Sequence, residues 1–152
     1  QQIRDWTFLN HPWSVDAPLS EVLSREVSRW SRRTGIAVKV AGSDSMDCLG
    51  NQQTVPVLRI VQEALTNVVR HGVNVDTVTI SVSLTGSTVS ISIIDNGKEA
   101  MNPQATSGLG MESMLGRAKS LGGAMTAMAT AAGFEVKIDL PRNRTLDRQF
   151  AE

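Results

Sequence analysis

The sequence of 152 residues contains a single cysteine, Cys48, and no excess of either charge, because 15 basic side chains balance 15 acidic ones. One cysteine cannot form an internal disulfide and has no partner thiols for a zinc site. A net charge of zero gives no global field that would attract nucleic acid or an anionic membrane surface. We therefore expect neither a disulfide-stapled secreted domain nor a nucleic-acid-binding protein.

Long apolar runs are also missing. No stretch approaches the roughly 20 apolar residues needed to cross a bilayer, and the N-terminus lacks the pattern of a secretory signal. There are no repeats or low-complexity tracts, and the length suits one domain with a real core. We expect a soluble, cytoplasmic domain without membrane contact of its own. Because it begins at Gln1 rather than at methionine, the chain is compatible with a piece of a longer protein, and the sequence leaves open whether that parent is anchored in a membrane.

The stretch from Leu58 to Gly72, LRIVQEALTNVVRHG, predicts an amphipathic helix. Its apolar face, read at about 100° per residue, consists of Val57, Val61, Leu65, Val68 and Val69. Offsets of four, seven and eight residues bring a polar stripe together on the other face. This stripe consists of Glu63, Asn67, Arg70 and His71. A carboxylate, a carboxamide, a guanidinium and an imidazole in one stripe can bind a metal and phosphates. The alternative is a surface helix whose polar residues face water.

A second motif, Asp95-Asn96-Gly97, ends an alternating run. Asn-Gly is the favoured pair of a type I′ hairpin turn, which is one interpretation. Against it, a loop rather than a strand pattern follows from Lys98 onward. An aspartate at a strand end, followed by a glycine that permits close approach, can instead accept a hydrogen bond from the amino group of a flat heterocycle.

A third motif, Gly108-Leu109-Gly110, precedes a predicted helix. It is not a dinucleotide fingerprint, because it follows a loop and lacks the third glycine, and no Gly-Lys-Ser/Thr of a P-loop occurs anywhere. Glycines before a helix N-terminus present free N–H groups and the positive end of the helix dipole, which suits phosphate. Simple entry into the helix is the alternative.

Hydrophobic periodicity gives the order of the elements. It predicts helices over 19–33, 58–72 and 111–121, and strands over 36–40, 77–84, 88–94, 124–130 and 134–140. We expect Asp16 to cap the first helix, Gly35 to end it, and the segment from Gly42 to Gln53 to be a polar loop. Hairpins mixed with helices argue for an α+β fold, a two-layer α/β sandwich with one sheet face covered by helices.

Taken together, the ordered segments QEALTNVVRHG, IIDNG, SGLGMESMLGRAKSLGG and GFEVKIDLP resemble the ATP-binding catalytic domain of bacterial two-component sensor histidine kinases. That domain has the Bergerat fold of the GHKL superfamily, shared with gyrase, heat-shock chaperone and mismatch-repair ATPases. The segments IRDWTFLNHP and SRRTGIAVKV are similar to the subfamily whose response regulators carry a helix-turn-helix domain. The resemblance spans nearly all of residues 3–142 and implies a mixed, mostly antiparallel sheet with three helices on one face.

The resemblance implies ATP and Mg²⁺ as cofactors and gives the polar stripe its roles. Glu63 and Asn67 are the implied catalytic residues: Glu63 orients a metal-bound water, and Asn67 coordinates Mg²⁺. Arg70 and His71 are implied to contact phosphate oxygens. This agrees with the chemistry, because Mg²⁺ prefers oxygen ligands and substrate phosphates, and phosphoryl transfer needs positioning and charge neutralisation.

For the other two motifs, the resemblance implies contacts to the rest of the nucleotide. Asp95 accepts the adenine amino hydrogen, and Gly97 lets the ring approach. A lid over the segment from Lys98 to Ser107 closes over the triphosphate. The implied ATP-binding hinge of that lid consists of Gly108, Leu109, Gly110 and Met111.

Two positions depart from the family pattern. Glu99 stands where the adenine motif usually has a second glycine, and Phe134 follows Gly133 where a threonine usually joins the adenine water network. Losing one such hydrogen bond costs about 1 kcal/mol, a several-fold loss of affinity. A non-catalytic interaction module that has lost the nucleotide is therefore an alternative.

The family's phosphate-accepting histidine lies on an upstream dimerisation element, and neither His11 nor His71 has that setting. We expect residues 1–16 to be a linker or the end of that element, 17–141 to be the ATP-binding catalytic domain, and 142–152 to be a charged tail. The implied partners are the dimerisation domain of a homodimeric parent protein and a response regulator. A stand-alone anti-sigma-type serine kinase on the same fold is the alternative.

Overall fold

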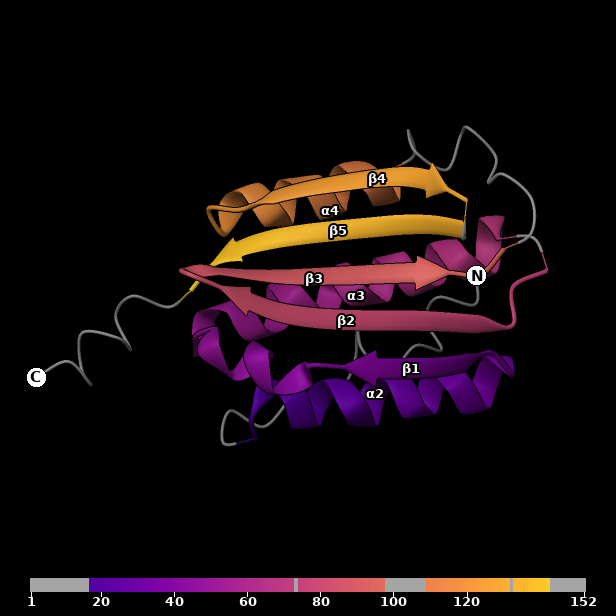
Figure 1. Cartoon of the computed structure of the whole chain (residues 1–152), viewed down its shortest axis with the longest axis horizontal. Coiled ribbons are helices and arrows are strands. Elements are labelled where there is room, and N and C mark those ends of the chain that lie inside the picture. Colours follow the sequence, from indigo (N-terminus) through magenta and orange to yellow (C-terminus); the bar gives the residue numbers. More distant parts are fainter. Residues whose placement is uncertain (1–16, 73, 98–108, 132, 143–152) are drawn as a thin grey trace, which may run out of the picture.

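The structure is a computed structural model that describes residues 17–72, 74–97, 109–131 and 133–142. The elements in chain order are α2 (Leu19–Thr34), β1 (Ala37–Ala41), the 3₁₀ helix η2 (Ser43–Cys48), α3 (Asn51–His71), β2 (Thr77–Thr85), β3 (Thr88–Asp95), α4 (Leu109–Ser120), β4 (Ala124–Thr130) and β5 (Gly133–Pro141). Figure 1 looks onto the sheet, with the three α-helices behind it.

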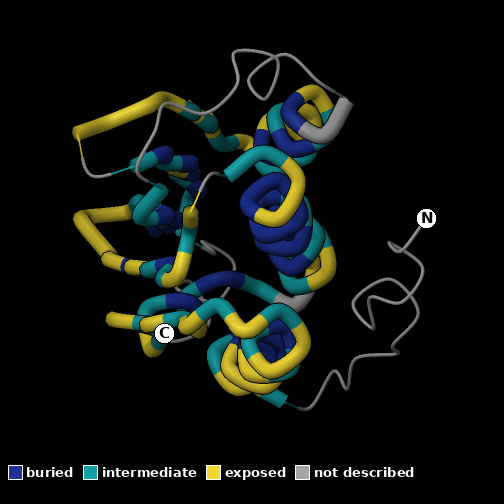
Figure 2. The backbone as a smooth tube through the Cα atoms, turned by 90° about the vertical axis from the view of Figure 1, so that its right-hand side faces the viewer, coloured by how far each residue is buried: buried dark blue, intermediate teal, exposed yellow. Residues whose placement is uncertain are grey.

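The strands form one mixed sheet in the order β1-β2-β3-β5-β4. Among the described strands, β1 and β2 pair in parallel and the other neighbours are antiparallel. Helices α2, α3 and α4 all cover the same face, as the side view in Figure 2 shows. The predicted α+β sandwich is therefore confirmed.

The two faces of the sheet follow from alternation along each strand. On β3, Val89, Ile91 and Ile93 are buried under the helices. The hydroxyls between them point to the open face, where Ser92 donates to the Glu135 carboxylate at 2.8 Å. Polar cross-strand pairs of this kind keep the open face compatible with water.

Helix α2 begins at Leu19 and ends before Gly35, as the sequence predicts, but its N-cap differs from the predicted one. Gly35 takes a left-handed conformation (φ 80°) and its N–H donates to the Ser31 carbonyl. The N-cap is Pro18, so the expectation that Asp16 caps the helix is wrong, and Asp16 itself lies outside the described residues. Proline has no N–H to satisfy and its fixed φ suits this position.

We expected the segment from Gly42 to Gln53 to be a polar loop, and this prediction is wrong. The segment contains η2, whose Met46 is fully buried, and the start of α3 at Asn51. The Asp47 carboxylate accepts hydrogen bonds from the N–H (3.1 Å) and hydroxyl (3.0 Å) of Ser20, which fastens η2 to α2. The two buried apolar side chains of this segment, Met46 and Leu49, are too few to give a periodicity from which it could be predicted.

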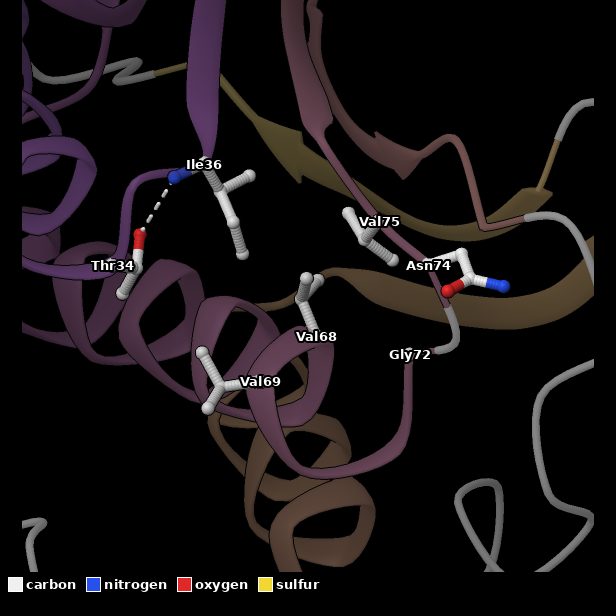
Figure 3. Close-up of a pocket in the computed structure, with 7 residues that line it drawn as sticks. All are labelled: Thr34, Ile36, Val68, Val69, Gly72, Asn74 and Val75. Atoms are coloured by element: carbon white, nitrogen blue, oxygen red, sulfur yellow. Dashed lines mark hydrogen bonds between the residues drawn. The ribbon is translucent and has the colours of Figure 1, made fainter.

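The apolar face of α3 is confirmed with one exception. Val57, Val61, Leu65 and Val68 are at most 6% exposed, whereas Val69 is 53% exposed. Val69 borders an open pocket between α3 and the junction of α2 with β1 (Figure 3). The prediction for Val69 is wrong because no element of the described residues covers the helix at this point.

Candidate functional site

The three motifs meet at one end of the molecule. The C-terminal ends of α3 and β3, the start of α4 and the connection from β4 to β5 all lie at the right-hand end in Figure 1, which faces the viewer in Figure 2. Segments separated by dozens of residues in the sequence are thus gathered around one edge of the sandwich.

Asp95, the last residue of β3, is 3% exposed and lies on the helix-covered face. It pairs with Val78 on β2. On the other side, the β3–β5 register ends at Ile94 and Glu135, so its continuation sets Asp95 opposite Phe134. The carboxylate therefore sits between two buried apolar side chains at the strand end.

One oxygen of this carboxylate is fixed by backbone donors. Asp95 Oδ1 accepts hydrogen bonds from the N–H of Gly97 (2.8 Å) and of Phe134 (3.3 Å). The backbone of Gly133 passes so close that an added Cβ would lie 1.8 Å from the Asp95 carbonyl oxygen. The rotamer of Asp95 is thus determined by contacts on both sides.

The other oxygen, Asp95 Oδ2, is buried and has no hydrogen-bond partner among the described residues. Buried carboxylate oxygens are costly without a donor, so such an atom calls for an explanation. A ligand N–H between apolar walls would supply the missing donor. A hairpin turn at residues 95–97 is excluded, because β3 pairs with β2 and β5 and the chain reaches β5 only after α4.

The four side chains of the polar stripe on α3 differ in how far they are buried. Asn67 is 6% exposed and its Nδ2 has no partner among the described residues. Glu63 and His71 are partly exposed, and Arg70 is exposed. Within the described part of the chain these four side chains make no hydrogen bond or ion pair with one another. The interpretation that the whole stripe faces water does not hold for Asn67.

The described residues contain no cluster of three or more His, Cys, Asp or Glu side chains that could hold a metal ion. An ion at this site would need other donors. The amide oxygen of Asn67 is a hard ligand of the type that Mg²⁺ accepts, and Mg²⁺ usually completes its shell with waters and substrate phosphates. The donor set fits an ion that arrives with a nucleotide.

The predicted hinge is described only in part. Gly108, Glu99 and the lid segment from Lys98 to Ser107 lie outside the described residues. Leu109 and Gly110 are the first residues of α4, and the Met111 side chain is packed in the core at 5% exposure. The contacts of the hinge with phosphate stay a prediction.

Sequence reasoning missed three contributors to the site. Asn96 makes hydrogen bonds to the start of β2, Phe134 donates its N–H to Asp95, and Arg59 lies one helical turn before Glu63 on the same stripe. The signal for Arg59 was its four-residue spacing. The resemblance had already placed Phe134 at the site, but its N–H contact with Asp95 and the hydrogen bonds of Asn96 become recognisable only with the strand register.

A separate pocket of about 370 Å³ lies on the α2 side of α3 (Figure 3). It is lined by Thr34, Ile36, Val68, Val69, Gly72, Asn74 and Val75. Its lining includes neither a residue of the polar stripe nor Asp95, so the pocket is distinct from the candidate site.

Among the helices that the structure describes, none has the length and apolar character needed to span a bilayer.

Residues 52–144 match the family described as histidine kinase-, DNA gyrase B-, and HSP90-like ATPase. The chain belongs to this family. The sensor histidine kinase LiaS of Bacillus subtilis is 34% identical over 87 residues, covering 56% of this chain and 24% of that protein. LnrJ of the same organism, also a sensor histidine kinase, is 32% identical over 108 residues, covering 71% of this chain and 26% of that protein. The chain thus spans about a quarter of these curated relatives.

Solved structures support the fold. The Erythrobacter litoralis EL346 blue-light activated histidine kinase superposes with a TM-score of 0.70 at 21% identity, covering 86% of this chain and 43% of that one. The ATP binding domain of PrrB from Mycobacterium tuberculosis gives 0.59 at 19% identity, covering 84% and 96%. The predicted family is confirmed: the chain is an ATP-binding catalytic domain of the sensor histidine kinase type.

Proposed function

We propose that this domain binds ATP with Mg²⁺ and delivers the γ-phosphate to a histidine on a separate dimerisation domain of its parent protein. Family membership implies ATP binding. The observation that carries the proposal for the site is the buried Asp95 Oδ2, which lacks a donor between Val78 and Phe134. A flat purine with an exocyclic amino group has the shape and the donor that this position requires.

The adenine end of the site is made by β3 and β5. The amino group donates to Asp95 Oδ2, while Oδ1 stays engaged by the Gly97 and Phe134 amides. Gly97 has no side chain to block the ring. The apolar side chain of Phe134 excludes water from the carboxylate, which strengthens the hydrogen bond to the base.

The phosphate end is made by α3. Asn67 is the residue that would hold Mg²⁺ through its amide oxygen, and the ion when bound neutralises phosphate charge. Glu63, one turn before Asn67 and partly exposed, is positioned on the stripe to orient a water of the metal shell. Arg70 and His71, at the C-terminal end of the helix, contact phosphate oxygens. The hinge formed by Gly108 to Met111 closes the lid.

The acceptor lies outside this chain. His71, on the polar stripe, faces the nucleotide in this assignment and is therefore not the phosphoacceptor. We take residues 17–141 as the catalytic domain and place this domain in the cytoplasm. The parent protein is a homodimer in this proposal, and a response regulator receives the phosphoryl group next. The relatives LiaS and LnrJ, both sensor histidine kinases, support this setting.

Titration with ATP and Mg²⁺ tests the nucleotide site. Asp95→Asn replaces the accepting oxygen or its partner by an amide, and we expect it to weaken ATP binding by about 100-fold, the equivalent of roughly 2.7 kcal/mol. The matched control is Asp139→Asn, which removes the same charge from the open face of the sheet, where Asp139 accepts a hydrogen bond from Ser90. Wild-type protein that binds no better than Asp95→Asn would support the degenerate interaction module.

Mixing the domain with a separately prepared dimerisation domain and labelled ATP tests the transfer. Phosphohistidine is lost in acid whereas phosphoserine survives it, so acid treatment identifies the acceptor. We expect acid-labile label on the dimerisation domain. Acid-stable label on a serine would contradict the histidine kinase assignment and favour the anti-sigma-type serine kinase.

A further inference from the structure

A group of hydrogen bonds at the edge of the site has no role in the function proposed so far. Asn96 Oδ1 accepts hydrogen bonds from the backbone N–H groups of Asp76 and Thr77, both at 3.0 Å. Its Nδ2 donates to Asp76 Oδ1 at 2.6 Å, and its own N–H donates to the Thr77 carbonyl at 3.1 Å. We call Asn96, Asp76 and Thr77 the Asn96 clamp.

The clamp connects two parts of the candidate site. Asn96 stands between Asp95 and Gly97, the residue whose N–H fixes Asp95 Oδ1. Asp76 and Thr77 stand at the start of β2, where the chain arrives from α3 after His71. Asp76 also accepts the N–H of Ala37 with its carbonyl, which ties the clamp to β1.

Removing the clamp would act on Asp95 through Gly97. The chain leaves β3 at residue 95, so no ladder hydrogen bond to a neighbouring strand orients Gly97. The backbone bond from Asn96 to Thr77 and the three side-chain bonds supply that orientation. Without them Gly97 is free to turn its N–H away, which leaves Asp95 Oδ1 with only the longer hydrogen bond from Phe134 among the described donors, so that Oδ2 is held less firmly in its direction.

We propose that Asn96 is a positioning residue for base recognition, which aims the Asp95 carboxylate at the amino group of the purine. This inference rests on the proposed nucleotide site and adds a residue that determines its selectivity for the base. The residue acts through Asp95 and Gly97 and does not itself contact the nucleotide.

The test compares two nucleotides. ATP carries the exocyclic amino group, and purine riboside triphosphate has only hydrogen at that position, so the ratio of their dissociation constants reports the Asp95 hydrogen bond alone. For the wild type we expect a preference for ATP of about tenfold or more, as for a hydrogen bond to a charged group. In Asp95→Asn we expect the preference for ATP over purine riboside triphosphate to be lost, so this variant is the reference.

The amide of Asn96 and the carboxylate of Asp76 can be exchanged between the two positions as a second test of the clamp. Asn96→Asp sets two carboxylates at hydrogen-bond distance, which repel, and we expect the ATP preference to fall to about twofold. Asp76→Asn keeps an accepting oxygen for Asn96 Nδ2, so we expect a preference within about twofold of the wild type. In the double variant Asn96→Asp/Asp76→Asn the donor and acceptor have changed places, and we expect the preference to return to within about threefold of the wild type.

The outcomes separate three cases. Equal weakening of both nucleotides by Asn96→Asp, with an unchanged ratio, would overturn the inference and leave Asn96 a stabilising residue only. Failure of the double variant to restore the ratio would overturn it too. If the wild type does not prefer ATP over purine riboside triphosphate, or if Asp95→Asn leaves its preference unchanged, the proposed nucleotide site is contradicted instead. If Asn96→Asp does not fold, Asn96→Gln, which displaces both polar groups by one methylene, supplies the same comparison.

Discussion

The end of β3 and the polar stripe of α3 lie at the same end of the molecule but are built in opposite ways. Asp95 is fixed by two backbone donors, and its neighbour Asn96 is bonded to the start of β2. The stripe residues Glu63, Asn67, Arg70 and His71 make no hydrogen bond or ion pair with one another in the described part of the chain. One region is held in place without a ligand, whereas the other is not.

This difference assigns the two regions different tasks. A fixed carboxylate between apolar walls costs little reorganisation when a base binds, so it gives selectivity. An open row of polar groups on a rigid helix acquires its geometry from the metal and phosphates that it binds. In the function that we propose, base recognition is therefore a property of the folded sheet, and phosphate recognition is completed by the ligand.

The largest effect on stability and ATP affinity should come from a side chain added at Gly133, where β5 lies against the backbone of Asp95. In Gly133→Ala the new Cβ would lie 1.8 Å from the Asp95 carbonyl oxygen, at a residue whose φ is 147°. Backbone must shift on both strands, and we expect the free energy of unfolding to fall by about 3 kcal/mol. Denaturant unfolding measures this change, and ATP affinity should fall with it.

Gly86→Ala is the matched control for that substitution. Gly86 also has a positive φ (59°), but nothing lies within 4 Å of the added Cβ. We expect a loss of about 1 kcal/mol from the backbone conformation alone. Equal losses at the two glycines would show that the close approach of β5 does not hold Asp95.

The next effect concerns the stripe. Asn67→Ala removes the amide that we assign to Mg²⁺, and we expect about tenfold weaker ATP binding in Mg²⁺ but unchanged binding without it. Because Nδ2 of Asn67 has no partner in the described structure, little stability should be lost. Gln62→Ala, which removes a buried amide of the same helix, is the control and should leave the effect of Mg²⁺ intact. A Mg²⁺ effect that survives Asn67→Ala would contradict the assignment.

Local patterns in the sequence predict much of this arrangement. The periodicity of residues 58–72 predicts the apolar face of α3 except for Val69, and the alternating run before Asp95 predicts that this residue stands at the end of a strand. Gly35 and the Gly86–Ser87 hairpin follow from local conformation. These features depend on neighbours within a few residues.

What the sequence could not predict depends on distant partners. The start of α3 at Asn51 was missed because its N-cap is Gly50, which has no capping side chain, and because the helix contains Pro56, a residue that usually disfavours a helix interior. The pairing of Asp95 with Phe134 and the hydrogen bonds of Asn96 require the register of β3 with β5 and β2. No local pattern contains that register.

The smallest effect should come from the exposed end of the stripe. Arg70→Ala removes a side chain that is solvent-exposed, so its attraction to phosphate is weakened by water and screened by salt. We expect ATP to bind about threefold more weakly at low ionic strength, with the difference disappearing above about 0.5 M salt. Lys137→Ala, which removes one positive charge from the open face of the sheet, should change neither value.

Titrations of both variants at several salt concentrations measure this contrast. A loss for Arg70→Ala that persists at high salt would mean that the guanidinium makes a desolvated contact with phosphate, since only charges in water are strongly screened. In the complex, Arg70 would then be shielded from water, as Asp95 is at the end of β3. In that case the nucleotide would draw Arg70 out of solvent, and the two regions would differ only before it binds.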